Sequence, residues 1–204
     1  MLFLLTSATG EPVTVEEVKS HLRLETTNDD ELIDGLIPVA RLNAENYMKR
    51  QIMPATYKLI LPNFPNDTAV IELPRPPLST ASSNVSVQYY LDTTIVDDAT
   101  TIPSTVYTVD YQREPGCIYP IYDNEWPSCV TDYKKDAVQI TYKTGYLNRS
   151  KVPEPIKHFI KMFVGSLYEN REPLYEGRFM NQLQPLDRAF YHGLLDPYVI
   201  IKIT

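Results

Sequence analysis

The clearest hydrophobic pattern in the chain lies between Val152 and Arg171. Seven apolar residues there recur at intervals of three and one, which places them on one side of a helix with 3.6 residues per turn. They are Ile156, Phe159, Ile160, Phe163, Val164, Leu167 and Tyr168, whereas Lys157, Lys161, Glu169 and Asn170 fall on the other side. Pro153 and Pro155 suit the start of this helix, and Pro173 ends it. A helix with one such apolar side must pack against other parts of the chain.

Two more helical patterns lie near the N-terminus. Thr14 followed by Glu17 is the sequence of a capping box, so a helix is expected to begin there. A second helix is expected to begin at Asn28, with Glu31 three residues later, and to run to about residue 51. Pro38 lies inside this second pattern and is expected to bend the helix, because its ring clashes with the carbonyl four residues earlier.

The pattern changes to that of strands after Pro54. Five segments rich in β-branched and aromatic residues are separated by Pro, Asn and Asp, which is typical of short strands joined by turns. These segments are 55–61, 69–73, 85–91, 106–109 and 137–142. Strands of this length and spacing favour a small antiparallel sandwich or barrel. The apolar residues 1–6 suggest a further short strand or an ordered arm.

The fold predicted from these patterns is α+β. A helical layer, made of two N-terminal helices and one long C-terminal helix, carries the small antiparallel β-module as an insertion and ends in an extended tail. The predicted parts are 1–51 (N-terminal helices), 52–150 (inserted β-module), 151–172 (long helix) and 173–204 (C-terminal interaction tail). Within the tail, residues 186–195 are read as a short helix and 199–203 as a final strand.

The tail is the candidate partner-binding segment. It is rich in apolar and aromatic residues but lacks strong periodicity, and it carries three acidic and three basic residues. Such a segment can order itself on a partner and bury aromatic anchors there, or it can fold back on its own domain. The candidate interface residues are Leu174, Tyr175, Phe179, Met180, Leu183, Leu186, Phe190, Tyr191, Leu194, Leu195 and Tyr198.

Composition narrows the choice of partner. The 204 residues have a net charge of −7. An acidic chain is a poor non-specific DNA binder, because such binding needs Lys and Arg against phosphates. The apolar start of the chain is too short for a signal peptide or a membrane span, so a cytosolic, soluble protein without membrane contact is expected. Cys117 and Cys129 are then expected to be reduced thiols, although the sequence does not exclude that they pair.

No arrangement of residues predicts catalysis, a cofactor or a metal. His21, His158 and His192 lack metal-pair spacing, and two cysteines cannot complete a four-ligand zinc site. The acidic residues 29–31 and 97–98 are read as a helix start and a polar turn rather than cation sites, since calcium-loop spacing is absent. Neither a G-x-S-x-G elbow nor a glycine-rich phosphate loop is present.

A series of short motifs resembles the head–tail connector proteins of tailed bacteriophages, also called adaptor or head-completion proteins. No single motif is diagnostic, but their order and spacing over about residues 10–172 carry the resemblance, and 173–204 match less well. The motifs are EPVTVEEVKSHLRL (11–24), DDELI (29–33), AR (40–41) followed by ENY (45–47), LPRPPL (73–78), VQYY (87–90), YTVD (107–110), WP (126–127), VQITYKTGY (138–146), VP (152–153) and YENRE (168–172). The β-insert is typical of one branch of the family.

This resemblance implies a structural subunit with no catalysis. Family members form homo-oligomeric rings, commonly of twelve copies, under the portal protein of the capsid. Genomic DNA passes through such a ring without specific binding, and stopper or tail-completion proteins dock on its far side. The C-terminal segment commonly reaches the portal, which would make the tail residues the portal interface. The resemblance also implies a place in the neck of the virion, after assembly in the host cytoplasm.

Two alternative functions remain open from the sequence. One is another neck or tail-completion component, such as a stopper protein, built on a similar β-module. The other is a small hydrolase, which would show a deep pocket with converging titratable groups.

Overall fold

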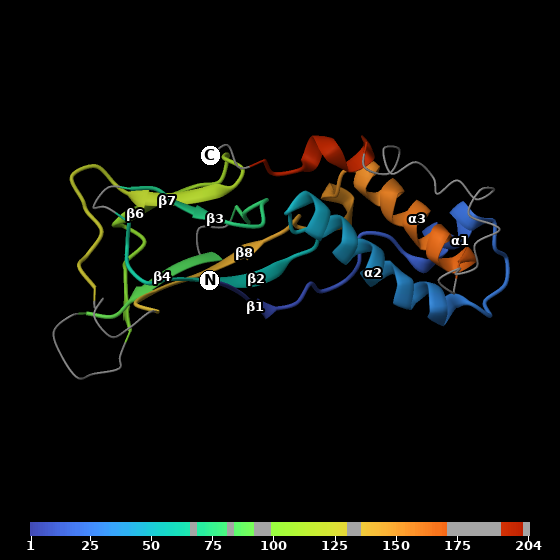
Figure 1. Ribbon diagram of the computed structural model, residues 1–204, viewed down its shortest axis with the longest axis horizontal. Helices are drawn as coiled ribbons and strands as arrows, with labels where there is room; N and C mark the ends of the chain where they lie inside the picture. Colours follow the sequence, from blue (N-terminus) through green and yellow to red (C-terminus); the bar gives the residue numbers. More distant parts are fainter. Residues whose placement is uncertain (66–68, 81–83, 92–98, 130–135, 171–192, 202–204) are drawn as a thin grey trace, which may run out of the picture. The chain divides into compact units, whose positions relative to one another are not determined.

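The computed structural model describes residues 1–65, 69–80, 84–91, 99–129, 136–170 and 193–201 (Figure 1). Contacts within the chain divide it into two units. The strand unit comprises Met1–Thr9 and Met53–Leu147, and the helical unit comprises Gly10–Ile52 and Asn148–Thr204. The predicted α+β class is confirmed, since the chain holds both helices and two antiparallel sheets.

The first two helices begin at polar caps. Helix α1 (Val15–Leu22) has the predicted capping box, in which the Thr14 hydroxyl accepts from the Glu17 N–H and the Glu17 carboxylate accepts from the Thr14 N–H. Helix α2 (Asp30–Met48) begins after Asp29, whose side chain makes no capping hydrogen bond, and ends where Lys49 takes a left-handed conformation. The predicted start at Asn28 and end near residue 51 were therefore wrong by one residue and by three.

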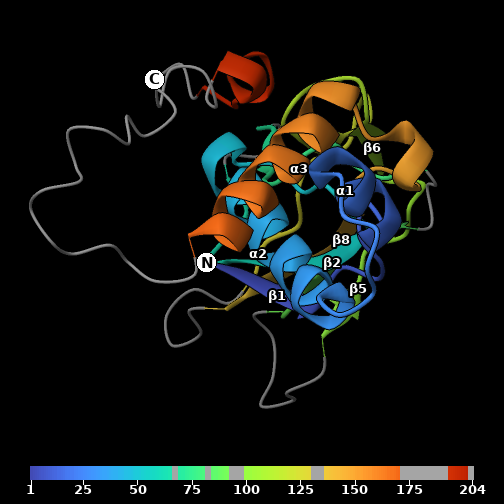
Figure 2. The same cartoon turned by 90° about the vertical axis from the view of Figure 1, so that its right-hand side faces the viewer.

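Helix α3 (Glu154–Glu169) packs against α1 and α2, as its apolar pattern required (Figure 2). Ile156, Phe159, Ile160 and Val164 are buried in this contact. Lys157 was expected on the solvent side but is only 9% exposed. Its aliphatic stem lies along apolar surface while its ammonium group reaches the Glu154 carboxylate at 2.8 Å.

The strand unit contains two antiparallel sheets. The larger has the order β1-β2-β8-β4-β5 and the smaller has the order β3-β7-β6. The strands are β1 (Leu2–Thr6), β2 (Ala55–Leu61), β3 (Ile71–Leu73), β4 (Val85–Tyr89), β5 (Thr100–Thr101), β6 (Tyr107–Asp110), β7 (Gly116–Pro120) and β8 (Val138–Thr144). Strands β2 and β8 pair over their whole length, from Ala55 opposite Thr144 to Leu61 opposite Val138.

The strand predictions are corrected in two places. Strands β5 and β7 were not foreseen, and the residues of β7 lie between two prolines that were read as marking connections. The predicted final strand is not formed by residues 199–201, and 202–204 lie outside the described part. The short strand expected within residues 1–6 is present as β1, which pairs with β2, and residues 1–9 group with the strand unit.

One hydrophobic core serves both sheets. It takes alternate residues from β2, β4 and β8, together with residues of β3, β6 and β7. Trp126 stacks on Phe64 with ring centroids 5.0 Å apart, and its indole N–H donates to the Ala69 carbonyl at 2.9 Å. Burial raises the pKa of Tyr142, whose hydroxyl donates to the Pro74 carbonyl at 2.8 Å. The β-branched and aromatic residues that predicted these strands thus supply much of the core.

Gly145 offers a test of the packing next to β8. Its φ is +105°, and an added Cβ would lie 2.5 Å from the Met53 carbonyl oxygen. We expect Gly145→Ala to lower the free energy of unfolding by about 2–4 kcal/mol, because strain and overlap add. Urea unfolding measures this change. As the control, Gly35→Ala in α2, where a Cβ meets nothing within 4 Å, should stabilise the chain by roughly 1 kcal/mol. Equal stability of Gly145→Ala and the unaltered chain would contradict this packing.

Candidate interaction surfaces

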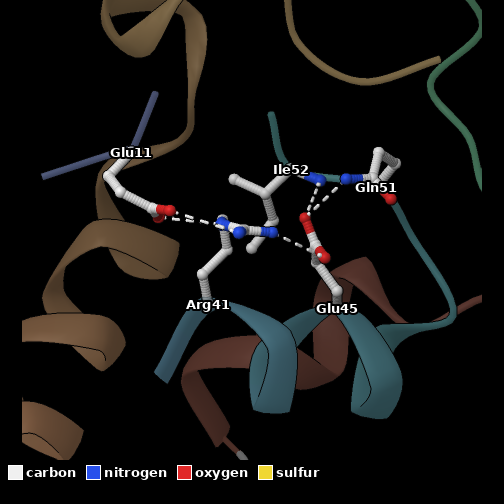
Figure 3. Close-up of polar contacts among 5 residues, drawn as sticks. All are labelled: Glu11, Arg41, Glu45, Gln51 and Ile52. Atoms are coloured by element: carbon white, nitrogen blue, oxygen red, sulfur yellow. Dashed lines mark hydrogen bonds and ion pairs between the residues drawn. The ribbon is translucent and has the colours of Figure 1, made fainter. Parts of the chain in front are cut away.

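A buried polar network is built around Arg41 of helix α2 (Figure 3). Its Nε donates to Glu11 Oε2 at 2.8 Å and its Nη2 to Glu11 Oε1 at 3.2 Å, which is a two-pronged pairing of guanidinium and carboxylate. Its Nη1 donates to Glu45 Oε2 at 3.1 Å. The other oxygen of Glu45, Oε1, accepts from Gln51 Nε2 and from the Ile52 N–H, both at 2.9 Å.

The charged groups of this network are buried and paired with one another, so they are not available to bind a ligand. Arg41 is 7% exposed and Glu45 is 3% exposed. Burial alone would lower the pKa of Arg41, but hydrogen bonds and charges from Glu11 and Glu45 outweigh it and raise the pKa. Arg41 therefore stays charged between its two carboxylates. Figure 3 shows these groups pointing at one another, so the network has a structural role.

This network also holds two of the three points where the chain passes between its units. Glu11 comes directly after the first passage, at Thr9 and Gly10, and Ile52 comes directly before the second, at Met53. Both are bonded to α2, through Arg41 and through Glu45. Helix α2 therefore fixes where both segments leave the helical unit.

The end of the tail lies on the C-terminal end of α2. The Ile200 N–H donates to the Met48 carbonyl at 3.0 Å, which satisfies one of the carbonyls that a helix end leaves without an intrahelical partner. The Tyr47 hydroxyl bonds the Asp196 carboxylate, and the Arg50 guanidinium bonds the Tyr198 carbonyl. Residues 193–201 are thus held by the helical unit of their own chain.

Of the eleven candidate interface residues, three fall in the described part. Leu195 is fully buried, whereas Leu194 and Tyr198 are half-buried. Tyr198 belongs to the 3₁₀ turn η3 (Asp196–Tyr198). The other eight, from Leu174 to Tyr191, lie outside the described residues. The structure therefore brings only the last part of the predicted surface into view, and this part contacts α2.

Strand β1 is an exposed apolar surface that the sequence did not mark as a site. It is the edge strand of the larger sheet. The exposed fractions of Phe3, Leu4 and Leu5 are 42%, 52% and 51%. Because neighbouring residues of a strand point to opposite faces, β1 is exposed on both of its faces. An apolar edge strand exposed on both faces is a surface that natural proteins cover with another element or another chain. The signal was the apolar run at the start of the chain.

The remaining candidate groups have partners inside the chain. The His21 and His158 rings meet edge to face, with centroids 5.6 Å apart, and burial followed by the charges of His158 and Lys161 lowers the pKa of His21. Asp29 accepts from the Tyr168 hydroxyl at 2.7 Å, and Lys19 lies 2.6 Å from Asp30. These contacts tie the start of α2 to α3 and α1, as expected of a helix start rather than a cation site. Residues 97–98 and His192 lie outside the described part.

Within the described ranges, no cluster of three or more His, Cys, Asp or Glu side chains has the arrangement of a metal site. Cys117 and Cys129 are both buried free thiols, in agreement with the reduced state expected for them. None of the described helices is long and apolar enough to cross a bilayer.

Comparison with known proteins finds one matching family model. The model of the phage gp6-like head-tail connector proteins matches residues 12–106, a range that covers α1, α2 and the strands up to the start of β6. Over this range, which is just under half of the chain, the sequence matches the head–tail connector family. The resemblance seen in the sequence motifs is thereby confirmed. No match among curated proteins was found.

Solved structures share the fold of this chain over its full length. A chain in the neck of an empty gene transfer agent (GTA) particle, computed with C6 symmetry, superposes with a TM-score of 0.75 at 15% identity. A chain in the neck of the native GTA particle, computed with C12 symmetry, gives 0.72 at 16% identity. In both cases the match covers 100% of this chain and 97% of the other. These comparisons indicate a structural connector and no enzyme family.

The buried network yields a prediction about stability. Glu45→Gln keeps the shape of the side chain but removes the charge facing Arg41 and one of two acceptor oxygens. We expect a loss of about 2–4 kcal/mol in the free energy of unfolding, because breaking one side of a buried pair leaves the other uncompensated. Chemical denaturation measures it.

The matched control for Glu45→Gln is Glu154→Gln. This residue pairs with Lys157 but is 79% exposed in its side chain, so its replacement should leave stability unchanged. Equal effects of the two replacements would show that the Arg41 network does not hold the helical unit together.

Proposed function

We propose that this connector protein is a head–tail adaptor. Copies of the chain form a ring in the neck of a virion, between the portal and the stopper or tail-completion proteins, and leave an axial channel for DNA. The single observation that carries the proposal is the likeness of the whole chain to proteins in virion necks computed with C6 and C12 symmetry. A twelve-membered ring, assembled in the host cytoplasm, is the form we propose.

The geometry supports a passive role in assembly. The most deeply buried charged groups described in the helical unit are Glu45, Arg50 and Arg41. They bond each other or the backbone of their own unit rather than line a reaction site. The strand unit, which we take to be a small β-sandwich because its two sheets share one core, leaves apolar β1 exposed at an edge. A ring subunit has neighbours that can cover such a surface.

The acidic charge supports free passage of DNA. Every Lys or Arg that neutralises a phosphate releases counterions and adds salt-dependent affinity. A chain with net charge −7 provides few such contacts and repels the duplex at long range. A ring of these chains would accordingly let DNA slide through rather than hold it.

The tail is the proposed portal-binding segment. Its end is held on α2 by the bonds of Asp196, Tyr198 and Ile200. The candidate residues that precede this hydrogen-bonded end run from Leu174 to Tyr191. They are rich in the aromatic side chains that dominate many protein interfaces. We therefore assign the main portal contact to these eight residues. The hydrogen bonds of Asp196, Tyr198 and Ile200 anchor the end of the segment.

Portal binding by the tail can be tested with point variants in the full chain. In the double variant Phe179→Ser, Phe190→Ser, we expect binding to the portal ring to weaken at least roughly a hundred-fold, since each aromatic anchor contributes about 1.4–2 kcal/mol. Surface plasmon resonance with immobilised portal measures this. The thermal unfolding of the variant should match that of the unaltered chain.

The control is Tyr122→Ser, which removes a side chain that is 99% exposed in the strand unit and should leave portal binding unchanged. A folded double variant that binds portal normally would remove the tail assignment. An unaltered chain that never associates with portal or neck assemblies would remove the adaptor proposal itself.

A further inference from the structure

Helix α2 has two apolar sides, and among the described residues only one of them is fully buried. The inner side faces the other helices of its unit and is fully buried. Its residues are Ile33, Ile37, Ala40, Ala44 and Met48. The second side, called here the outer stripe, consists of Leu32, Gly35, Leu36, Val39 and Leu42. At 100° per residue these five positions fall within an arc of roughly 120°.

The outer stripe is open to solvent. Leu32 is 37% exposed, and Val39 and Leu42 are each 50% exposed. Three large apolar side chains at this exposure lie on one side of the same helix, which is more than the single exposed apolar residues that any surface has.

The outer stripe is also free of charge, although the chain is strongly acidic. All five charged residues of α2 lie outside its arc, whereas the two asparagines, Asn43 and Asn46, lie inside it. The charged residues are Asp30, Glu31, Asp34, Arg41 and Glu45. Two acidic chains repel each other over most of their surfaces, so an uncharged stripe is where copies with net charge −7 can meet.

Gly35 is a second, independent reason to expect that another element packs on the outer stripe. A glycine in a helix interior is less favourable than alanine by about 1 kcal/mol. Apart from the chain neighbours of Gly35 and the backbone of its own helix, no described atom lies within 4 Å of the Cβ that alanine would add, so packing among the described residues does not require glycine. A position of this kind on an exposed apolar stripe permits close approach by the backbone of another element.

We propose that the outer stripe of α2 is covered by a second copy of this chain, as a contact between neighbouring subunits of the ring. This inference rests on the proposed adaptor function, since a closed ring is what brings copies side by side. In a cyclic ring the contact is heterologous, so the stripe of one copy meets a different surface of the next. Gly35 marks the point of closest approach.

A photo-crosslinking experiment identifies the occupant. A photoreactive phenylalanine analogue replaces Val39 in the full chain, which is then assembled on the portal and irradiated. The expected product is a crosslink between two copies, with twice the mass of one chain and mapped by peptide mass spectrometry. A crosslink to residues 171–192 of the same chain, or to the portal, would overturn the proposal, as would assembly without any crosslink.

Two substitutions test the same contact by its energetics. Gly35→Ala should raise the unfolding temperature of the isolated chain and yet lower the fraction of chains in ring-sized assemblies roughly ten-fold, because the added methyl overpacks the contact. Val39→Glu should lower that fraction roughly ten-fold or more by placing a charge in the contact. The control is Ser20→Glu, at an exposed position of α1. It adds the same charge in the same unit, and this variant should assemble normally.

Normal ring assembly by Gly35→Ala and Val39→Glu would overturn this inference and leave the adaptor function standing. Failure of the unaltered chain to assemble on the portal would remove both. Sedimentation velocity of each variant with and without portal separates these outcomes, and thermal unfolding confirms that every variant is folded.

Discussion

The helical unit depends on the pairing of Arg41 with Glu11 and Glu45. Arg41 and Glu45 are buried and Glu11 is partly buried. Burying these charges is tolerable because they pair with one another and because the remaining oxygen of Glu45 accepts from Gln51 and from the Ile52 N–H. The network joins the segment that enters the helical unit, the middle of α2 and the segment that leaves it. Removing one member would therefore release a chain passage as well as a charge.

Because these buried charges are paired inside the chain, binding to other molecules must come from groups at the surface. The charged side chains of Arg41, Glu11 and Glu45 are bonded to one another, whereas apolar side chains of β1 and of the α2 outer stripe are exposed. An enzyme needs the opposite arrangement, with polar groups converging on a substrate and apolar groups enclosing them. A subunit that assembles with copies and partners needs apolar contact surfaces and closed polar networks, and this chain has both.

The sequence predicted the features that local physics controls. The Thr14 capping box and the stripe of α3 follow from hydrogen bonding and helical periodicity, and both were confirmed. β7 was missed because Pro115 and Pro120 outweighed the short run between them, although a proline at a strand end is compatible with pairing. The Arg41 network was beyond reach, because Glu11 and Arg41 are thirty residues apart and only the fold joins them. The outer stripe of α2 was hidden in the same way, since periodicity marks apolar residues without telling which side another element covers.

The central claim is that copies of this chain assemble as a passive ring in a virion neck. The most direct measurement is electron cryomicroscopy of the chain mixed with its portal, reconstructed without imposed symmetry. The account predicts a closed ring of identical copies on the portal, with an open axial channel and with each α2 outer stripe covered by the neighbouring copy. Chains bound singly, or a portal that stays bare, would contradict it.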